Sequence, residues 1–290
     1  MNKKKVTNIL AALALLVMVA TSLISIALDD GGQPYPYATL RDEVVEIYGG
    51  EGVYQFDTIF KAVMFRGFDW ANLFVAAPIL IWAIVLYRRD QFKGKLLITA
   101  VFAYLVYIYL IGVMGNAFNM MFLFWTALFA LGFFGLTLIL PQIDLRSFPE
   151  HSKDGFPRKG LLIYMLFVGL FLSYQYLSEI FSAYAAGLPP TSLAHYTTLE
   201  LAAMEVGIMI PLHFIAGVLL WKKNAIGSLL AGVLVFASLM TFTALAIANL
   251  VLYMNYEIGV VMDFAVPIIL TMIVLLLVVS IVRHVDSDQG

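Results

Sequence analysis

The sequence lacks cysteine and is poor in charge. None of its 290 residues is cysteine, and 12% are Asp, Glu, Lys or Arg, which is about half the share in an ordinary soluble domain. The missing cysteine excludes disulfides, thiolate catalysis, iron–sulfur clusters and thiolate zinc sites. The H-E-x-x-H, G-x-S-x-G and Walker lysine motifs are also absent, so no established catalytic template applies. We expect no cofactor and no nucleic-acid partner, and an enzyme is the less favoured class.

Apolar residues make up 62% of the chain. They gather in runs near 20 residues, about the length that an α-helix needs to cross roughly 30 Å of hydrocarbon. We therefore predict an all-α, polytopic integral membrane helix bundle, with the lipid bilayer as its main partner. The eight predicted spans cover residues 8–28, 69–87, 96–114, 118–140, 161–183, 197–221, 225–250 and 259–282.

The basic residues predict the orientation of the bundle, because Lys and Arg gather in the cytoplasmic loops of membrane proteins. Eight spans place 14 of the 17 on one side: Lys3, Lys4, Lys5, Arg88, Arg89, Lys93, Lys95, Arg146, Lys153, Arg158, Lys159, Lys222, Lys223 and Arg283. Only three fall on the opposite side: Arg41, Lys61 and Arg66. We predict that the N-terminus and the C-terminus are both cytoplasmic.

The first span also has features of a secretory signal peptide, because three lysines precede an apolar run. The run from Ile9 to Leu28 is longer than the roughly 7–15 residues of such a signal. No clean A-x-A cleavage site precedes Asp29. We predict a retained span, and cleavage is the alternative.

The longest predicted outer loop covers residues 29–68 and begins with the turn-rich stretch DDGGQPYPYATL. Its second part, DTIFKAVMFRGFDW, predicts a short amphipathic helix that Asp57 caps and Gly67 ends. Asp69 would then cap the second span. Apolar residues on one side and two cations on the other are typical of a helix in the membrane interface. We favour a plug packed over the bundle, and membrane sensing is the alternative.

Two stretches of the chain resemble each other. PILIWAIVLYRRDQFKGKLL (78–97) and PLHFIAGVLLWKKNAIGSLL (211–230) both have a proline, apolar turns, paired cations, a glycine and the start of the next span. Four spans separate them, so the copies would share one orientation, as in a parallel 4+4 repeat. We predict two four-helix halves, residues 1–140 and 161–290, joined by a cytoplasmic linker at 141–160. A common hairpin style without duplication is the alternative.

Polar side chains within the predicted spans are the strongest functional signal, because an ionisable group in lipid is costly unless it is paired, hydrated or neutral. Glu205 lies about eight residues into the sixth span, roughly 12 Å below the outer surface. His213 lies eight residues further on, about 80° around the helix. The remaining candidates lie in the outer half: Glu179, Asp263, Asn249, Asn116 and Asn119.

These residues predict an acidic, outward-facing cavity for a cation, a proton or a basic small molecule. Neighbouring carboxylates cannot all stay ionised without a counter-ion, and few cations are expected near them. Glu205 would be the central charge, Glu179 and Asp263 its partners, and Asn116 and Asn119 the rim. The alternative is a protonated glutamate that only holds two helices together.

Other polar residues have simpler expectations. We expect Glu200 to be interfacial and solvated and His195 to be an inert loop residue. For Asn116 and Asn119, closing the turn between the third and fourth spans is the simpler role. His195 and Glu200 have the spacing of an acyltransferase His/acid pair, but no catalytic domain surrounds them. A metal site built from His195, Glu200, Glu179 and Asp263 would need several spans to converge, so the presence of a metal stays open.

Three stretches resemble uncharacterised multi-pass membrane proteins of bacteria and archaea. They are RGFDWANLFVAAPILIWAIVLYRR (66–89), MGNAFNMMFLFWTALFALGFF (114–134) and MEVGIMIPLHFIAGVLLWKKNAIGSLLA (204–231), and together they cover about a quarter of the chain. The resemblance implies a prokaryotic cell (inner) membrane and brings no activity with it. It also implies an aspartate at the position of Glu205, so an acid is expected there.

The leading functional hypothesis is a transporter, a permease-like protein or a binding protein, with a cation or small molecule as its ligand. The first alternative is a non-catalytic structural or accessory subunit, assembled with a membrane partner or with copies of itself. The second is a metal-dependent membrane enzyme that uses the outer carboxylates. The missing soluble domain and missing catalytic motifs place the enzyme last.

Overall fold

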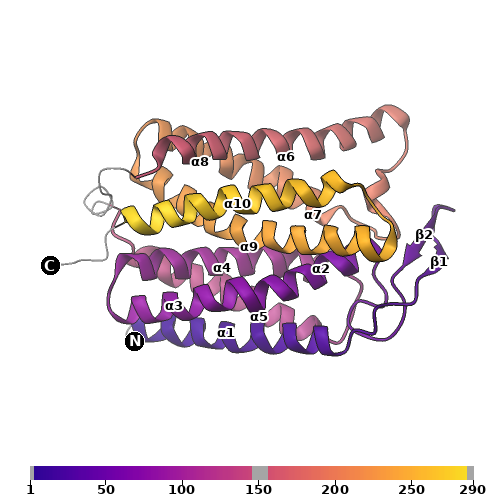
Figure 1. The fold of residues 1–290 in the computed structure, drawn as a ribbon, viewed down its shortest axis with the longest axis horizontal. Helices are drawn as coiled ribbons and strands as arrows, with labels where there is room; N and C mark the ends of the chain where they lie inside the picture. Colours follow the sequence, from indigo (N-terminus) through magenta and orange to yellow (C-terminus); the bar gives the residue numbers. More distant parts are fainter. Residues whose placement is uncertain (1–2, 146–155, 286–290) are drawn as a thin grey trace.

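The computed structural model is a bundle of long helices that run side by side (Figure 1). It describes residues 3–145 and 156–285, so half of the predicted linker 141–160 lies outside the described residues. Eight helices are long and apolar enough to cross a membrane, which confirms that part of the prediction. Their bounds are Lys3–Ala27 (α1), Ile59–Arg88 (α2, η1 and α3), Phe92–Gly115 (α4), Phe122–Gln142 (α5 and η2), Arg158–Ala186 (α6), Glu200–Trp221 (α7, η4 and α8), Ala225–Tyr256 (α9) and Val261–His284 (α10).

The two ends of the bundle differ. The start of α1 and the end of α10 lie at one end, the terminal end, and a β-hairpin protrudes from the other, the hairpin end (Figure 1). In the hairpin, β1 (Tyr35–Ala38) pairs antiparallel with β2 (Val44–Ile47). The all-α prediction missed these two strands, which are short and mostly exposed.

The second membrane helix begins earlier than predicted. Residues 59–68 do not form a separate interfacial helix, because they are the first turns of one continuous helix that ends at Arg88. The cap is Thr58, whose hydroxyl accepts a hydrogen bond from the N–H of Lys61 at 3.3 Å. Asp57, the predicted cap, is buried and takes part in a different network.

Gly67 and Asp69 explain why the predicted boundary between a short helix and the second span was wrong. Gly67 does not end the helix; it lets α9 approach, and a Cβ there would overlap the carbonyl oxygen of Ala244. Asp69 caps nothing, because it is buried in mid-helix and accepts a hydrogen bond of 2.7 Å from the hydroxyl of Tyr54. Glycine and aspartate often stand at helix ends, where they terminate or cap the helix. Here both residues lie inside the helix and make tertiary contacts.

The segment between the hairpin and α2 packs over the end of the bundle. Tyr48, Val53 and Tyr54 are each at most 3% exposed and belong to the main hydrophobic core. In the hairpin itself, both Tyr35 and Tyr37 are exposed. The segment between α1 and α2 therefore combines a packed plug with a projecting hairpin.

Helices α4 and α9 form the centre of the bundle. α4 packs against α3, α5 and α9, while α9 packs against α2, α8 and α10. On both sides of the α4–α9 contact, consecutive helices pack together: α3 with α4 and α4 with α5 on one side, α8 with α9 and α9 with α10 on the other.

Two of the membrane helices contain a π-helical turn. η1 (Asn72–Ala76) and η4 (Glu205–Met209) each stand just before a proline, at Pro78 and Pro211. Proline has no N–H to donate to the preceding turn, and a π-helical turn is a common way to accommodate such a break in the α-helical ladder. These turns fix the orientation of the polar residues on them.

The turns that follow the two proline helices have the same geometry. Asp90 and Lys223 both take a left-handed conformation, with φ of 61° and 57°. The N–H of the next residue bonds to the carbonyl five residues earlier, at 3.1 Å in the first turn and 2.9 Å in the second. A Cβ on Gly94 or on Gly227 would overlap the backbone of the preceding helix, so both turns need glycine at the same place.

Candidate functional site

Glu205 is the first residue of η4 and is 5% exposed. Its own helix begins at Glu200, which places Glu205 about 8 Å from the start of that helix at 1.5 Å per residue. Its partner Tyr107 lies eight residues from the end of α4 at Gly115, or about 12 Å inside. The carboxyl group therefore lies within the bundle, in the half near the hairpin end.

The carboxyl group of Glu205 is only half satisfied. The hydroxyl of Tyr107 donates a hydrogen bond to Oε1, whereas Oε2 is buried and has no partner among the described residues. Tyr176 of α6 lies within electrostatic range of the same carboxyl. No ion pair in the described part of the chain includes Glu205. Because an unpaired carboxylate in this position would be costly, the geometry suits a neutral, protonated acid.

His213 lies on the same face of its helix as Glu205. In an uninterrupted α-helix the two side chains would be about 80° apart. The π-helical turn between them accommodates one extra residue, which turns His213 back by about 100° and leaves roughly 20°. His213 is 1% exposed and faces α6, where a Cβ on Gly169 would lie 3.4 Å from its own Cβ.

The tautomer of His213 follows from its one hydrogen bond. Nδ1 lies 2.7 Å from the carbonyl oxygen of Met209, which can only accept, so Nδ1 carries the proton. Nε2 is buried and has no partner in the described residues. A neutral His213 therefore presents a free acceptor inside the bundle.

Glu179 and Asp263 make no hydrogen bond with Glu205, but Glu179 lies within electrostatic range of Tyr176, as Glu205 does. Glu179, near the end of α6, accepts a hydrogen bond of 3.1 Å from the N–H of Ser192 in the loop that follows. Asp263 is exposed, and its Oδ2 accepts a bond of 2.7 Å from the N–H of Val260, which caps α10. The structure thus brings His213 to the face of Glu205 and places the other two carboxylates at the helix ends.

Asn116 and Asn119 lie in the turn between α4 and α5. Asn119 closes the turn, with Oδ1 accepting from the N–H of Met121 at 2.9 Å and Nδ2 donating to the carbonyl of Ala117 at 3.2 Å. Both asparagines line a pocket of about 70 Å³. Trp125 forms part of its wall, and Glu205 does not line it. This pocket has room for a few water molecules, and it lies apart from the central carboxyl.

The cations at the hairpin end are paired more fully than the sequence suggested. Arg41 pairs with Glu43 at 3.3 Å, Arg66 with Asp29, and Lys61 with Glu200 at 2.6 Å. The expectation of a solvated Glu200 is wrong, because its side chain is 10% exposed and is bound to Lys61. Asp57, Asp69 and Glu205 are buried acids outside these ion pairs, and of the three only Glu205 has a buried oxygen with no partner among the described residues.

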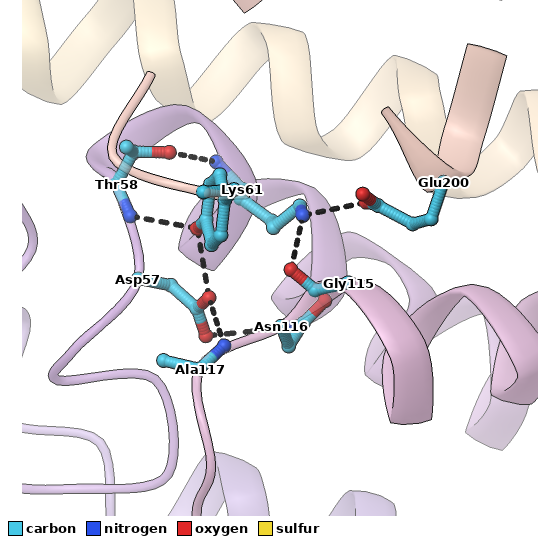
Figure 2. A network of polar contacts seen from close by, with 8 residues as sticks. Asp57, Thr58, Lys61, Gly115, Asn116, Ala117 and Glu200 are labelled. Atoms are coloured by element: carbon cyan, nitrogen blue, oxygen red, sulfur yellow. Dashed lines mark hydrogen bonds and ion pairs between the residues drawn. The ribbon is translucent and has the colours of Figure 1, made fainter. Parts of the chain in front are cut away.

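A polar network that sequence reasoning missed surrounds Asp57 (Figure 2). Asp57 is fully buried, and its Oδ1 accepts hydrogen bonds of 2.8 Å from the N–H of Ala117 and from the hydroxyl of Tyr196. Figure 2 shows the adjoining contacts, in which Lys61 reaches both Glu200 and the carbonyl of Gly115. The network joins the starts of α2 and α7 to the α4–α5 turn.

Charge and burial set the titration of two groups in this network. Burial raises the pKa of Asp57 to about 6, although the Ala117 N–H, the Tyr196 hydroxyl and the Lys61 ammonium act in the opposite direction. Burial and then Lys61 lower the pKa of His195. His195 is therefore neutral at pH 7.

The π-helical turn of the first half contains a polar group that is fully bonded. Asn72 is 1% exposed, and its Nδ2 donates to Ser22 Oγ and to the hydroxyl of Tyr109, each at 3.1 Å. The hydroxyl of Tyr104 donates to Oδ1 at 2.8 Å. This cluster holds α1, α4 and the second helix together and leaves no atom of the Asn72 side chain without a partner.

The described residues contain no group of three or more His, Asp or Glu side chains arranged to hold a metal ion. His195, Glu200, Glu179 and Asp263 thus do not converge on one point in this part of the chain. In comparisons with known proteins, no family model, curated protein or solved structure matches the chain.

Proposed function

We propose that the protein is a transporter-like or binding membrane protein in which Glu205 exchanges a proton for a cation or a basic small molecule. The observation that carries the proposal is the state of one carboxyl group. Glu205 is buried at a π-helical turn, has one bonded and one unbonded oxygen, and forms no ion pair with any cation of the described residues. Intramembrane acids of this kind mark ion and substrate paths in many membrane proteins.

The charge state of Glu205 would decide what the site binds. A neutral carboxyl is tolerated in the bundle, whereas an ionised one needs a positive partner. Loss of the proton would therefore favour capture of a cation, and return of the proton would release it. Tyr107 and Tyr176 would line the site and supply hydroxyl groups to the ligand.

The helices around Glu205 leave a route for a ligand. In the first half, α1 packs along α5. In the second half, the corresponding helices α6 and α10 make only sparse contact. Beyond Gly169, towards the hairpin end, Ala183 is the one buried residue of α6. The outer part of α6 is therefore free to move away from Glu205 without disrupting the core.

We propose as part of this function that the chain contains an internal 4+4 repeat. Asn72 and Glu205, Pro78 and Pro211, and the left-handed Asp90 and Lys223 are each 133 positions apart, and they occupy the same places in the two helix pairs. Parallel repeats of this kind are related by an axis along the membrane normal, and transporters use their interface as the binding site. The basic residues at the terminal end favour placing that end in the cytoplasm of a cell membrane.

The test is thermal unfolding of the purified protein in detergent, across pH and a panel of cations and amines. Binding to the folded state raises its stability by RT ln(1 + [L]/Kd), or about 2.7 kcal/mol at a ligand concentration of 100 Kd. We expect a ligand-specific rise in the wild-type protein that Glu205→Gln loses. Glu46→Gln, which alters an exposed carboxylate on β2, should keep the rise and serves as the matched control. If no cation or amine raises the unfolding temperature of any of the three proteins, the proposal is wrong.

The projecting hairpin favours a second candidate function, that of an accessory subunit. Leu40 at its tip is 96% exposed and Val44 is 68% exposed, and apolar side chains presented together at a protein surface often mark an interface. A photo-crosslinking residue placed at position 40 should capture one membrane partner, or a second copy of the chain, in native membranes. Crosslinks to lipid alone would count against this role.

A further inference from the structure

The second half contains three buried polar residues that each have an atom without a partner. They are Glu205 (Oε2), His213 (Nε2) and Tyr164 (hydroxyl), and they are 5%, 1% and 4% exposed. Buried polar atoms are rarely left unbonded, and in native proteins ordered water usually completes them. Glu205 on η4 faces Tyr107 of α4, while His213 and Tyr164 lie where α6 meets α8 and α9.

The residues are spaced at regular intervals along the bundle. His213 is eight residues from Glu205, about 12 Å along the helix axis. It lies level with Gly169 of α6, and Tyr164 is five residues from Gly169 towards the terminal end, or about 8 Å. Tyr164 faces α9, where Ser238 lies near its hydroxyl. The series thus descends from the hairpin half of the bundle towards the start of α6 at Arg158.

The chemistry of the three atoms is complementary. A neutral Glu205 whose Oε1 accepts from Tyr107 has a proton to donate from Oε2. His213 has its proton on Nδ1, because Met209 O can only accept, and so offers Nε2 as an acceptor. The hydroxyl of Tyr164 can accept one proton and donate another. The series therefore runs donor, acceptor, then relay.

From this arrangement we infer a proton path that links Glu205 to the terminal end of the bundle through His213 and Tyr164. About 12 Å of helix separates Glu205 from His213, so the proton on Glu205 Oε2 passes along a chain of several waters to His213 Nε2. This step leaves a carboxylate and an imidazolium. The same proton then leaves Nε2 for water at the Tyr164 hydroxyl, and neutral histidine is restored. Nδ1–H stays bonded to Met209 throughout. The path rests on the proposed function, because it supplies the proton that Glu205 exchanges.

The groups that face the path come from each packed element. Tyr107 of α4 and Tyr176 of α6 face Glu205, Gly169 of α6 faces His213, and Ser238 of α9 faces Tyr164. None of these is a cation that would block proton entry. The first half offers no parallel series at its π-helical turn, because every polar atom of the Asn72 side chain is bonded.

The test measures hydrogen–deuterium exchange of the Glu205 carboxyl by infrared spectroscopy of the protein in lipid vesicles. The carboxylic C=O band that Glu205→Gln removes reports the proton on that residue, and it shifts when deuterium replaces hydrogen. We expect His213→Phe and Tyr164→Phe each to slow this shift at least tenfold. Tyr164→Phe removes a hydroxyl whose one interaction among the described residues is a weak one with the Ser238 side chain, so this variant should fold normally. Tyr104→Phe, which removes a buried hydroxyl of the Asn72 cluster, is the matched control and should exchange at the wild-type rate.

Two further outcomes separate this inference from the proposed function. A Glu205 band that exchanges equally fast in the wild-type protein and in both variants would overturn the path and leave the proposed function standing. The absence of any band that Glu205→Gln removes, between pH 5 and 8, would show an ionised Glu205 and overturn both.

Discussion

The same helical turn holds an amide in one half of the bundle and an acid in the other. Asn72 and Glu205 each begin a π-helical turn six residues before a proline, and each accepts a hydrogen bond from a tyrosine of α4. Both are buried. Every polar atom of the Asn72 side chain is bonded, whereas Oε2 of Glu205 is not. Depth and helix shape therefore do not distinguish a structural residue from a candidate site; the unsatisfied atom does.

The helices around the two turns also differ, because they pack more closely around Asn72 than around Glu205. α1 packs along α5 and closes the first half, while α6 scarcely touches α10 in the second. A closed half with a satisfied amide suits a scaffold. An open half with a half-satisfied acid suits a part that moves and binds. Substitutions that exchange the properties of the two turns should therefore have unequal effects.

The largest effect should come from placing an acid in the first half. Asn72→Asp removes both donors to Ser22 and Tyr109 and introduces a carboxyl near the buried Asp69. We expect a loss of about 3–5 kcal/mol in the free energy of unfolding, because a buried charge would be left without a cation. Glu205→Gln, which keeps the size and the acceptor for Tyr107, should change it by less than about 1 kcal/mol. Unfolding by a denaturing detergent measures both, and equal losses would break the comparison.

The next effect concerns the ion pair that ties the two halves together at the hairpin end. Lys61→Met leaves the buried Glu200 without its cation and should cost about 3 kcal/mol of stability. The double variant Lys61→Met/Glu200→Leu should recover much of that loss, because it removes both charges. The same cycle on Arg41 and Glu43, which are more exposed, should give a coupling below about 1 kcal/mol. Similar coupling energies for the two pairs would mean that the halves are not joined by Lys61 and Glu200.

Asp57 predicts a pH dependence at the same end of the bundle. Its folded-state pKa of about 6 lies above its ordinary value of 3.8, so the folded protein binds the proton more tightly than the unfolded chain does. Stability from this group is therefore full below about pH 4 and is lost as pH rises through 6. The shift corresponds to about 3 kcal/mol at most. Thermal unfolding between pH 4 and 7 should show this decline in the wild-type protein and a flatter profile in Asp57→Asn.

The long apolar helices were predictable, because about 20 apolar residues suffice to indicate a span. The continuous helix through Gly67 and Asp69 was not, since the features that stop a helix in solution here serve contacts with α9 and Tyr54. The importance of Glu205 was also visible, because an acid in an apolar run needs an explanation. Its unbonded oxygen and its alignment with His213 depend on the π-helical turn and on side chains from other helices, and the sequence pattern contains neither.

The network around Asp57 lay beyond sequence reasoning for a different reason. Its partners Ala117 and Tyr196 are 60 and 139 positions away in the chain. A local pattern predicts caps and turns well, and for that reason it assigned Asp57 to a cap. Only the packing of α2 and α7 against the α4–α5 turn reveals the other role.

The smallest predicted effect tests whether the two turns at the terminal end are equivalent. Gly94→Ala and Gly227→Ala each place a Cβ against the backbone of the preceding helix, and overpacking of this kind typically costs about 1–3 kcal/mol. Because both turns share the left-handed residue and the same backbone hydrogen bond, the two losses should agree within about 0.5 kcal/mol. Gly207→Ala, in open space, is the control and should be nearly neutral. If only one of the two variants loses stability, the two turns resemble each other in sequence but do not both require glycine. The proposed repeat would then lose its best structural support.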